Sequence, residues 1–168
     1  MTVQLYAQPY DISATGFYFD CYDDYANRAA KLRNAHGDSV EEFEIQFIDG
    51  EQIDCALAQA IAIDQVNLST FFNAVEHWDE DDKLRVILAV GECDYAFDAD
   101  TQPDEFEVDI YHLNTMRDLA EQFVEEGLFG DIPERLLFYI DYDAIARDLS
   151  VDYAQATVAG QSLIYRCA

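Results

Sequence analysis

The sequence predicts an α+β protein made of three small subdomains. Two stretches, residues 43–47 and 106–110, alternate apolar residues with polar, mainly acidic ones in the period of two that a half-exposed β-strand requires. The middle of the chain instead repeats its apolar residues with helical spacing. The expected subdomains are a mixed α/β unit at residues 1–60, a helical unit at 61–103 and a second mixed α/β unit at 104–168.

The first unit is expected to contain three strands and one helix. Residues 3–6 and 16–21 are short strand candidates, and the second is rich in aromatic residues that suit a pleated, half-buried surface. From Asp24 the apolar residues recur with helical spacing until Gly37 ends the pattern. The third strand, at 43–47, turns its carboxylates away from its apolar face.

The middle of the chain predicts three short helices, which need one another's apolar faces to persist and so form a small bundle. An acid run at residues 79–82 precedes the third helix, where the positive end of the helix macrodipole favours carboxylates. A connector is expected from 91 to 104. The apolar positions of the three helices are Ile53, Leu57, Ala60 and Ile61; Leu68, Phe71, Phe72 and Val75; and Leu84, Ile87 and Leu88.

The last unit begins with the alternating strand at 106–110, followed by the clearest helical pattern of the chain, at 116–124. Pro133 is a start signal for the next helix, and Asp141 can cap another. A β-hairpin at 154–166 follows. The residues expected to be buried on the helix after Asp141 are Tyr142, Ile145, Ala146 and Leu149.

The charge of the chain is extreme, with 35 acids against 9 bases and a net charge of -26. Residues 1–60 carry 11 acids and 3 bases, residues 61–103 carry 10 and 2, and residues 104–168 carry 14 and 4. The acidic residues are therefore spread along the whole chain. We expect this chain to fold, since 51% of its residues are hydrophobic and 14% are aromatic. Such a surface opposes compaction through self-repulsion and makes nucleic acid an unfavourable partner.

The cysteines and the apolar runs indicate a cytoplasmic protein. The four cysteines lie far apart without a CxxC spacing, so we expect reduced core thiols. The first residues have neither a basic region nor a long apolar run, and no run of about 18 apolar residues occurs, so we expect no signal peptide and no membrane span. The cysteines are Cys21, Cys55, Cys93 and Cys167.

No catalytic residue, metal ligand or cofactor is expected. The chain has no GxGxxG, GxxxxGK[ST], HExxH or GxSxG motif, and its three histidines are isolated from one another. Residues 98–104 resemble the start of a calcium loop, but Pro103 stands where an EF-hand needs glycine, and Asp109 stands where it needs glutamate. We therefore interpret this stretch as a solvated acidic loop.

Three explanations of the negative charge are compatible with the amino-acid composition. A high-salt-adapted interaction domain carries acid everywhere to stay hydrated, and the presence of only two lysines fits it. A protein that imitates DNA sets carboxylates in place of phosphates, and 26 net charges match about 13 base pairs of duplex. The third class is an acidic cation-binding protein.

A specific resemblance favours the second explanation. Residues 130–149, GDIPERLLFYIDYDAIARDL, are similar to the C-terminal segment of the ArdA-type antirestriction proteins, in which Pro-Glu, a tyrosine, Asp-Tyr-Glu/Asp-Ala and Ala-Arg-Asp-Leu recur in this order. The hairpin ending at 160–166 is also similar. Residues 16–20 align loosely with a family Gly-x-Trp-x-Asp segment, with Tyr18 in place of tryptophan, and residues 44–51 match another strand and turn loosely.

The resemblance implies an elongated protein of three parts, a curved rod that forms a homodimer through its C-terminal parts. The family acts without catalysis: it mimics B-form DNA and occupies the DNA-binding groove of type I restriction-modification enzymes, on their methyltransferase core. This blocks restriction and often modification. The implied partners are such an enzyme and a second copy of the chain, with no nucleic acid and no membrane.

Two sets of residues are expected to carry this function. The predicted mimic residues are Asp20, Asp23, Asp24, Glu42, Glu44, Asp79, Glu80, Asp81, Asp82, Asp94, Asp98, Asp100, Asp104, Glu105, Glu107, Asp109, Asp118, Glu121, Glu125 and Glu126. The antirestriction motif, which the resemblance places at the dimer contact, is represented by Phe129, Ile132, Pro133, Leu136, Tyr139, Ile140, Asp141 and Tyr142. The apolar members of the motif have plain core packing as their alternative role.

Overall fold

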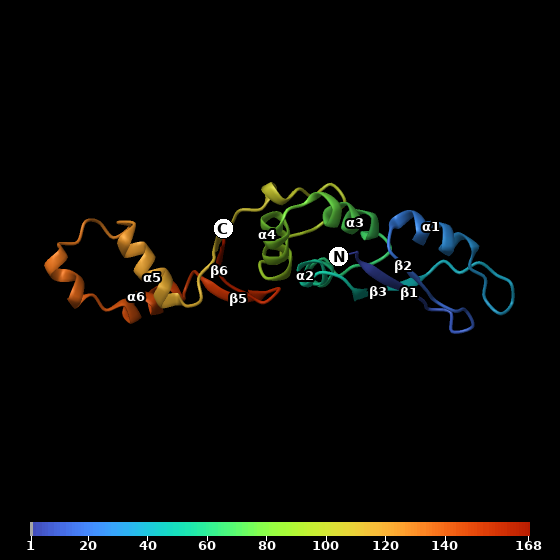
Figure 1. Cartoon of the computed structure of the whole chain (residues 1–168), viewed down its shortest axis with the longest axis horizontal. Coiled ribbons are helices and arrows are strands. Elements are labelled where there is room, and N and C mark those ends of the chain that lie inside the picture. Colours follow the sequence, from blue (N-terminus) through green and yellow to red (C-terminus); the bar gives the residue numbers. More distant parts are fainter. Residues whose placement is uncertain (1) are drawn as a thin grey trace. The chain divides into compact units, whose positions relative to one another are not determined.

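Two antiparallel three-stranded sheets and a set of short helices form the α+β fold that the sequence predicts. The computed structural model (Figure 1) describes residues 2–168, and backbone contacts divide the chain into two compact units, Met1–Phe106 and Glu107–Ala168. The division into three subdomains stays a prediction. No helix within residues 2–168 has the length and apolar character needed to cross a bilayer.

The sheet of the first unit has β1 at its centre, paired antiparallel with β2 on one side and β3 on the other. Leu5 of β1 lies opposite Phe19 and Phe47, and its side chain is fully buried. The alternation predicted for the third strand is confirmed, because Phe43 and Ile45 are buried while Glu44 is exposed. The strands are β1 (Gln4–Pro9), β2 (Phe17–Phe19) and β3 (Phe43–Asp49).

Four helices complete the core of the first unit. Tyr25 of α1 is buried among the aromatic rings of the sheet, with its ring centroid 5.0 Å from that of Phe19. The three helices predicted for the middle of the chain are present, and α2 packs against α4. Asp79 caps α4 by accepting a hydrogen bond from the backbone N–H of Asp82 at 2.9 Å. The helices are α1 (Tyr22–Lys31), α2 (Gln52–Ala60), α3 (Leu68–His77) and α4 (Glu80–Gly91), followed by the 3-10 helix η1 (Pro103–Glu105).

In the second unit, β6 lies between β4 and β5, and both pairings are antiparallel. Leu119 and Phe123 of α5 form a buried cluster with Ile164 of β6. The predicted hairpin near the end of the chain is confirmed. The elements are β4 (Val108–Tyr111), α5 (Met116–Glu125), the 3-10 helix η2 (Glu134–Tyr139), α6 (Tyr142–Leu149), β5 (Ala154–Val158) and β6 (Gln161–Cys167).

Three local predictions need correction. The strand expected at 106–110 begins at Val108, because the backbone N–H of Phe106 still bonds to Pro103 at the end of η1. The segment after Pro133 is a 3-10 helix rather than an α-helix. The helix α6 buries none of its residues completely, and its four apolar side chains are half-buried against a small unit that covers one side of the helix only.

The prediction that all four cysteines are reduced core thiols is wrong in part. Neither Cys93 nor Cys167 is a reduced thiol, because each is disulfide-bonded, which the wide spacing of the cysteines did not predict. Cys21 is a free thiol but it is exposed, since its sulfur sits at the N-terminus of α1 and accepts a hydrogen bond from the backbone N–H of Asp24 at 3.5 Å. Cys55 is free and half-buried.

Candidate functional site

The carboxylates cover the surface of both units. All 35 acids belong to the described residues, and 28 of them are exposed, whereas Asp54 alone is buried. None of the predicted mimic residues is buried. The five that are half-buried are Asp24, Asp82, Asp109, Asp118 and Glu121.

Two local structural features place acidic side chains at the surface of the first unit: the alternation of β3 and the N-terminus of α4. In β3 the period of two sends Glu44 outward while its neighbours fill the core. At the start of α4 the carboxylates occupy the cap and the first turn, where the unpaired backbone N–H groups and the macrodipole favour negative charge. Asp79, Glu80 and Asp81 are exposed there. Both features place charge outside without burying a carboxylate.

Several acids of the second unit also hold its structure. Asp118 forms a capping box with Thr115 at the start of α5, with hydrogen bonds of 3.1 Å in each direction. Arg117 bridges α5 and α6, because it donates to Glu121 at 3.2 Å and to Asp143 at 2.9 Å. The hydrogen bonds to Asp143 and Glu121 raise the pKa of the Arg117 guanidinium. Three predicted mimic residues form ion pairs with arginine: Asp24 with Arg28 in the first unit, and Asp109 with Arg166 and Glu121 with Arg117 in the second.

The loop before η1 is ordered by its own hydrogen bonds. The carboxylate of Asp98 accepts from the backbone N–H of Asp100 at 2.9 Å and from the hydroxyl of Thr101 at 3.1 Å. Thr101 in turn is buried. Among residues 2–168, no three histidine, cysteine or acidic side chains come together in a way that holds a metal ion.

Five of the eight residues predicted for the antirestriction motif lie in an exposed apolar segment, residues 128–139, and the other three directly follow it. Figure 1 shows the chain between α5 and α6 as a loop that extends away from the sheet of its unit, and η2 within it has no buried residue. Phe138 is 95% exposed and Tyr139 is 83% exposed. Surfaces of this kind on soluble proteins mark contacts with another molecule. The large exposed apolar residues of the segment are Leu128, Phe129, Leu136, Leu137, Phe138 and Tyr139.

The structure separates the motif residues into two groups. Phe129, Leu136 and Tyr139 are exposed, whereas Ile132, Ile140 and Tyr142 are half-buried. Pro133 immediately precedes η2 and is exposed. Asp141 caps α6 by accepting from the backbone N–H of Ala144 at 3.0 Å, and Arg117 lies 5.7 Å from the centre of the Tyr142 ring.

The sequence prediction missed three exposed apolar residues of the segment: Leu128, Leu137 and Phe138. The signal for them was a run of large apolar side chains in 128–139 that follows neither the helical period nor the strand period. Such a run cannot place all its apolar residues on one buried face, so part of it remains at the surface.

The family model described as "Antirestriction protein (ArdA)" matches residues 12–161, which include both sets of predicted functional residues. No curated protein shows significant similarity to the chain.

Proposed function

The chain belongs to the ArdA family of antirestriction proteins, and we propose that it inhibits type I restriction-modification enzymes by occupying the groove in which they bind DNA. The inhibition acts by binding, without catalysis, on the methyltransferase core of the enzyme in the cytoplasm. It blocks restriction and, where the core is shared, modification.

The observation that carries this proposal is the exposure of the carboxylates on both units. The net charge of -26 corresponds to about 44 Å of duplex, or about 13 base pairs, at about one charge per 1.7 Å of helix axis. Because 28 of the 35 acids are exposed, most of this charge lies at the surface, where a basic groove can contact it. Electrostatic steering makes association with such a groove fast and salt-dependent.

The exposed apolar segment supports the second part of the proposal, a homodimer. Phe138 and Tyr139 have no packing partner that covers them within their own unit, so a second copy of the chain gains apolar contact area there. The dimer doubles the length of the charge array to about 26 base pairs. We propose an elongated particle in which the three subdomains, residues 1–60, 61–103 and 104–168, present the predicted mimic residues and the C-terminal parts make the contact.

A competition experiment tests the inhibition. A type I methyltransferase core is bound to a fluorescent duplex that contains its recognition sequence, and the protein is added at rising concentration and at several salt concentrations. We expect complete displacement of the duplex, with an apparent affinity that falls steeply as salt rises. Undiminished DNA binding in excess protein would rule out occupation of the groove. An unrelated acidic protein of similar net charge is the control for non-specific effects.

A further inference from the structure

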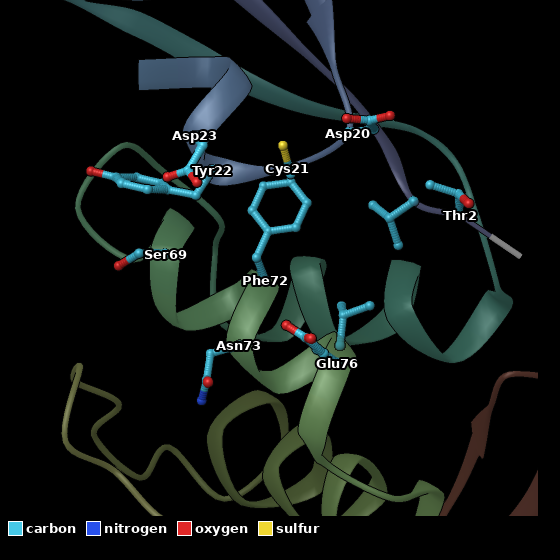
Figure 2. A pocket seen from close by; sticks show the side chains of 11 residues that line it. Thr2, Asp20, Cys21, Tyr22, Asp23, Ser69, Phe72, Asn73 and Glu76 are labelled. Atoms are coloured by element: carbon cyan, nitrogen blue, oxygen red, sulfur yellow. The ribbon is translucent and has the colours of Figure 1, made fainter. Parts of the chain in front are cut away.

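A pocket of about 440 Å³ lies in the first unit where the end of β2 and the start of α1 face α3. All of its lining residues belong to the first unit, whereas the exposed apolar segment belongs to the second. In Figure 2 the ring of Phe72 points from α3 toward Cys21, with Tyr22 and Asp23 on one side of it and Asp20 on the other. The remaining lining residues are Thr2, Val3, Ser69, Asn73, Val75 and Glu76.

The floor of the pocket is apolar and firmly held. Phe72 and Val75 of α3 are half-buried, and Val3 beside them is buried. The Phe72 ring packs edge-on against Phe19 of β2, with 6.1 Å between centroids. A ring fixed in this way offers a preformed apolar surface that needs no rearrangement to receive a ligand.

The rim of the pocket is anionic. Asp20, Asp23 and Glu76 are all exposed, and no lysine or arginine lines the pocket. Within residues 2–168 none of the three carboxylates forms a salt bridge with a basic side chain. An apolar hollow bordered by unpaired carboxylates is complementary to a side chain with an apolar stem and a cationic head.

We propose that this pocket receives an arginine side chain of the inhibited enzyme. The methylene stem lies on Phe72 and Val75, and the guanidinium reaches the carboxylates of the rim. Tyr22, a residue that is 42% exposed, offers a ring face for cation–π stacking. Arginine fits better than lysine because its planar guanidinium both stacks on aromatic rings and bonds carboxylates through two N–H groups.

This inference rests on the proposed inhibition and adds to it an apolar contact that imitation of the DNA phosphates does not provide. A phosphate presents charge to a basic side chain but no hollow for its stem. Apolar contact is not screened by salt, whereas exposed charge pairs lose strength beyond a Debye length of about 10 Å at 0.1 M ionic strength. The pocket therefore makes part of the binding less salt-sensitive than binding of duplex DNA.

Two pairs of matched variants test the pocket in the DNA-displacement assay. The pocket triple variant is Asp20→Asn, Asp23→Asn, Glu76→Gln, and its control removes the same charges from exposed positions outside the pocket: Asp38→Asn, Asp81→Asn, Glu42→Gln. Asn73→Trp fills the pocket without changing charge, and Asn27→Trp places the same residue on an exposed part of α1. Circular dichroism confirms that each variant is folded.

We expect the pocket triple variant to inhibit about tenfold less well than its control, which corresponds to about 1.4 kcal/mol of binding free energy. Asn73→Trp weakens inhibition by a similar factor and Asn27→Trp leaves it unchanged. Equal inhibition by the pocket variants and their controls would overturn the pocket while leaving groove occupation intact.

A second experiment measures ligand binding to the pocket in the absence of the enzyme. The full-length protein, labelled with ¹⁵N, is titrated with N-acetyl-arginine-amide and, separately, with N-acetyl-norleucine-amide. We expect amide shifts confined to the pocket residues with the arginine compound alone, and their loss in Asn73→Trp. Shifts spread over all acidic surfaces, or none at the pocket, would contradict the inference even if the protein displaces DNA. Pocket shifts in a protein that does not displace DNA would contradict the proposed inhibition alone.

Discussion

The ammonium of Lys83 donates to the carboxylate of Asp54 at 2.7 Å, and both side chains are buried between α4 and α2. Of the 35 acidic residues, Asp54 is the one that is buried, and it is paired with a basic residue that is buried as well. Their pairing joins two helices of the first unit that otherwise meet through apolar side chains.

Removing one partner of this pair is expected to destabilise the protein strongly. Lys83→Met leaves the Asp54 carboxylate buried without a cation, which costs about 3–5 kcal/mol. The double variant Lys83→Met, Asp54→Leu removes both charges and recovers most of that loss. Urea denaturation followed by circular dichroism measures the free energies of unfolding. The control is Arg28→Met, which breaks an exposed pair with Asp24 and costs about 0–1 kcal/mol.

The exposed apolar segment is expected to set the oligomeric state. Phe138→Ser combined with Tyr139→Ser removes two of its most exposed side chains, so the dimer dissociates while the fold persists. Sedimentation equilibrium and small-angle scattering measure the mass and size of the particle. The control is Ile12→Ser, which alters a side chain that is 100% exposed in the first unit and leaves the dimer unchanged. A wild-type protein that is already monomeric at working concentration would contradict the homodimer.

Outside the pocket, loss of single carboxylates is expected to be mild and cumulative. Glu44→Gln or Glu125→Gln alone weakens inhibition by about twofold or less, because many exposed acids share the interaction. Six such changes together weaken it by more than tenfold and flatten the salt dependence. The displacement assay measures both effects. Complete loss of inhibition from one of these single changes would point to a local site instead of a distributed surface.

Ionic strength is expected to change stability without unfolding the protein. Repulsion among the exposed acids acts over about 30 Å at 0.01 M ionic strength and over about 10 Å at 0.1 M, so the melting temperature rises between these two conditions. Calorimetry measures the shift. Complete unfolding at 0.01 M would instead indicate adaptation to high salt, which is the alternative explanation of the composition.

The hydrogen bonds that the Asp11 carboxylate accepts from Asn34 and Ser13 are expected to depend on pH. The pKa of its carboxyl is lowered from 3.8, chiefly by a hydrogen bond from the side chain of Asn34 at 2.9 Å and also by Ser13. Since the folded pKa is the lower one, the stabilisation is present above pH 3.8 and is lost as the pH falls through the lowered value. Asn34→Ala moves the pKa of Asp11 back toward 3.8, which a ¹³C-detected NMR titration measures.

Local patterns predicted most of the secondary structure, because each depends on neighbours in the sequence. The period of two around Phe43 and Ile45 and the helical stripe that includes Leu119 and Phe123 were sufficient for β3 and α5. The segment at 134–139 was harder, since a start signal such as Pro133 does not distinguish a 3-10 helix from an α-helix.

The relations between distant residues had no local signal. Lys83 and Asp54 are 29 positions apart, and no local pattern singles out Asp54 as the partner of Lys83, which directly follows an acid run. No sequence pattern indicated the pocket either, because its lining residues Asp20 and Glu76 come from segments more than 50 residues apart. The exposure of Phe138 in particular was not predicted, because the aperiodic apolar run at 128–139 indicates that some of its residues remain at the surface but not which ones.

The outward carboxylates of β3 have a consequence for solubility. β3 is an edge strand, so one side of its backbone has no partner strand, and its exposed Ile48 adds an apolar contact for any strand that approaches. Glu44 and Asp49 on the same strand repel a second copy that carries the same charges. The charge that suits a basic groove thereby also acts as a gatekeeper against aggregation through the sheet edge.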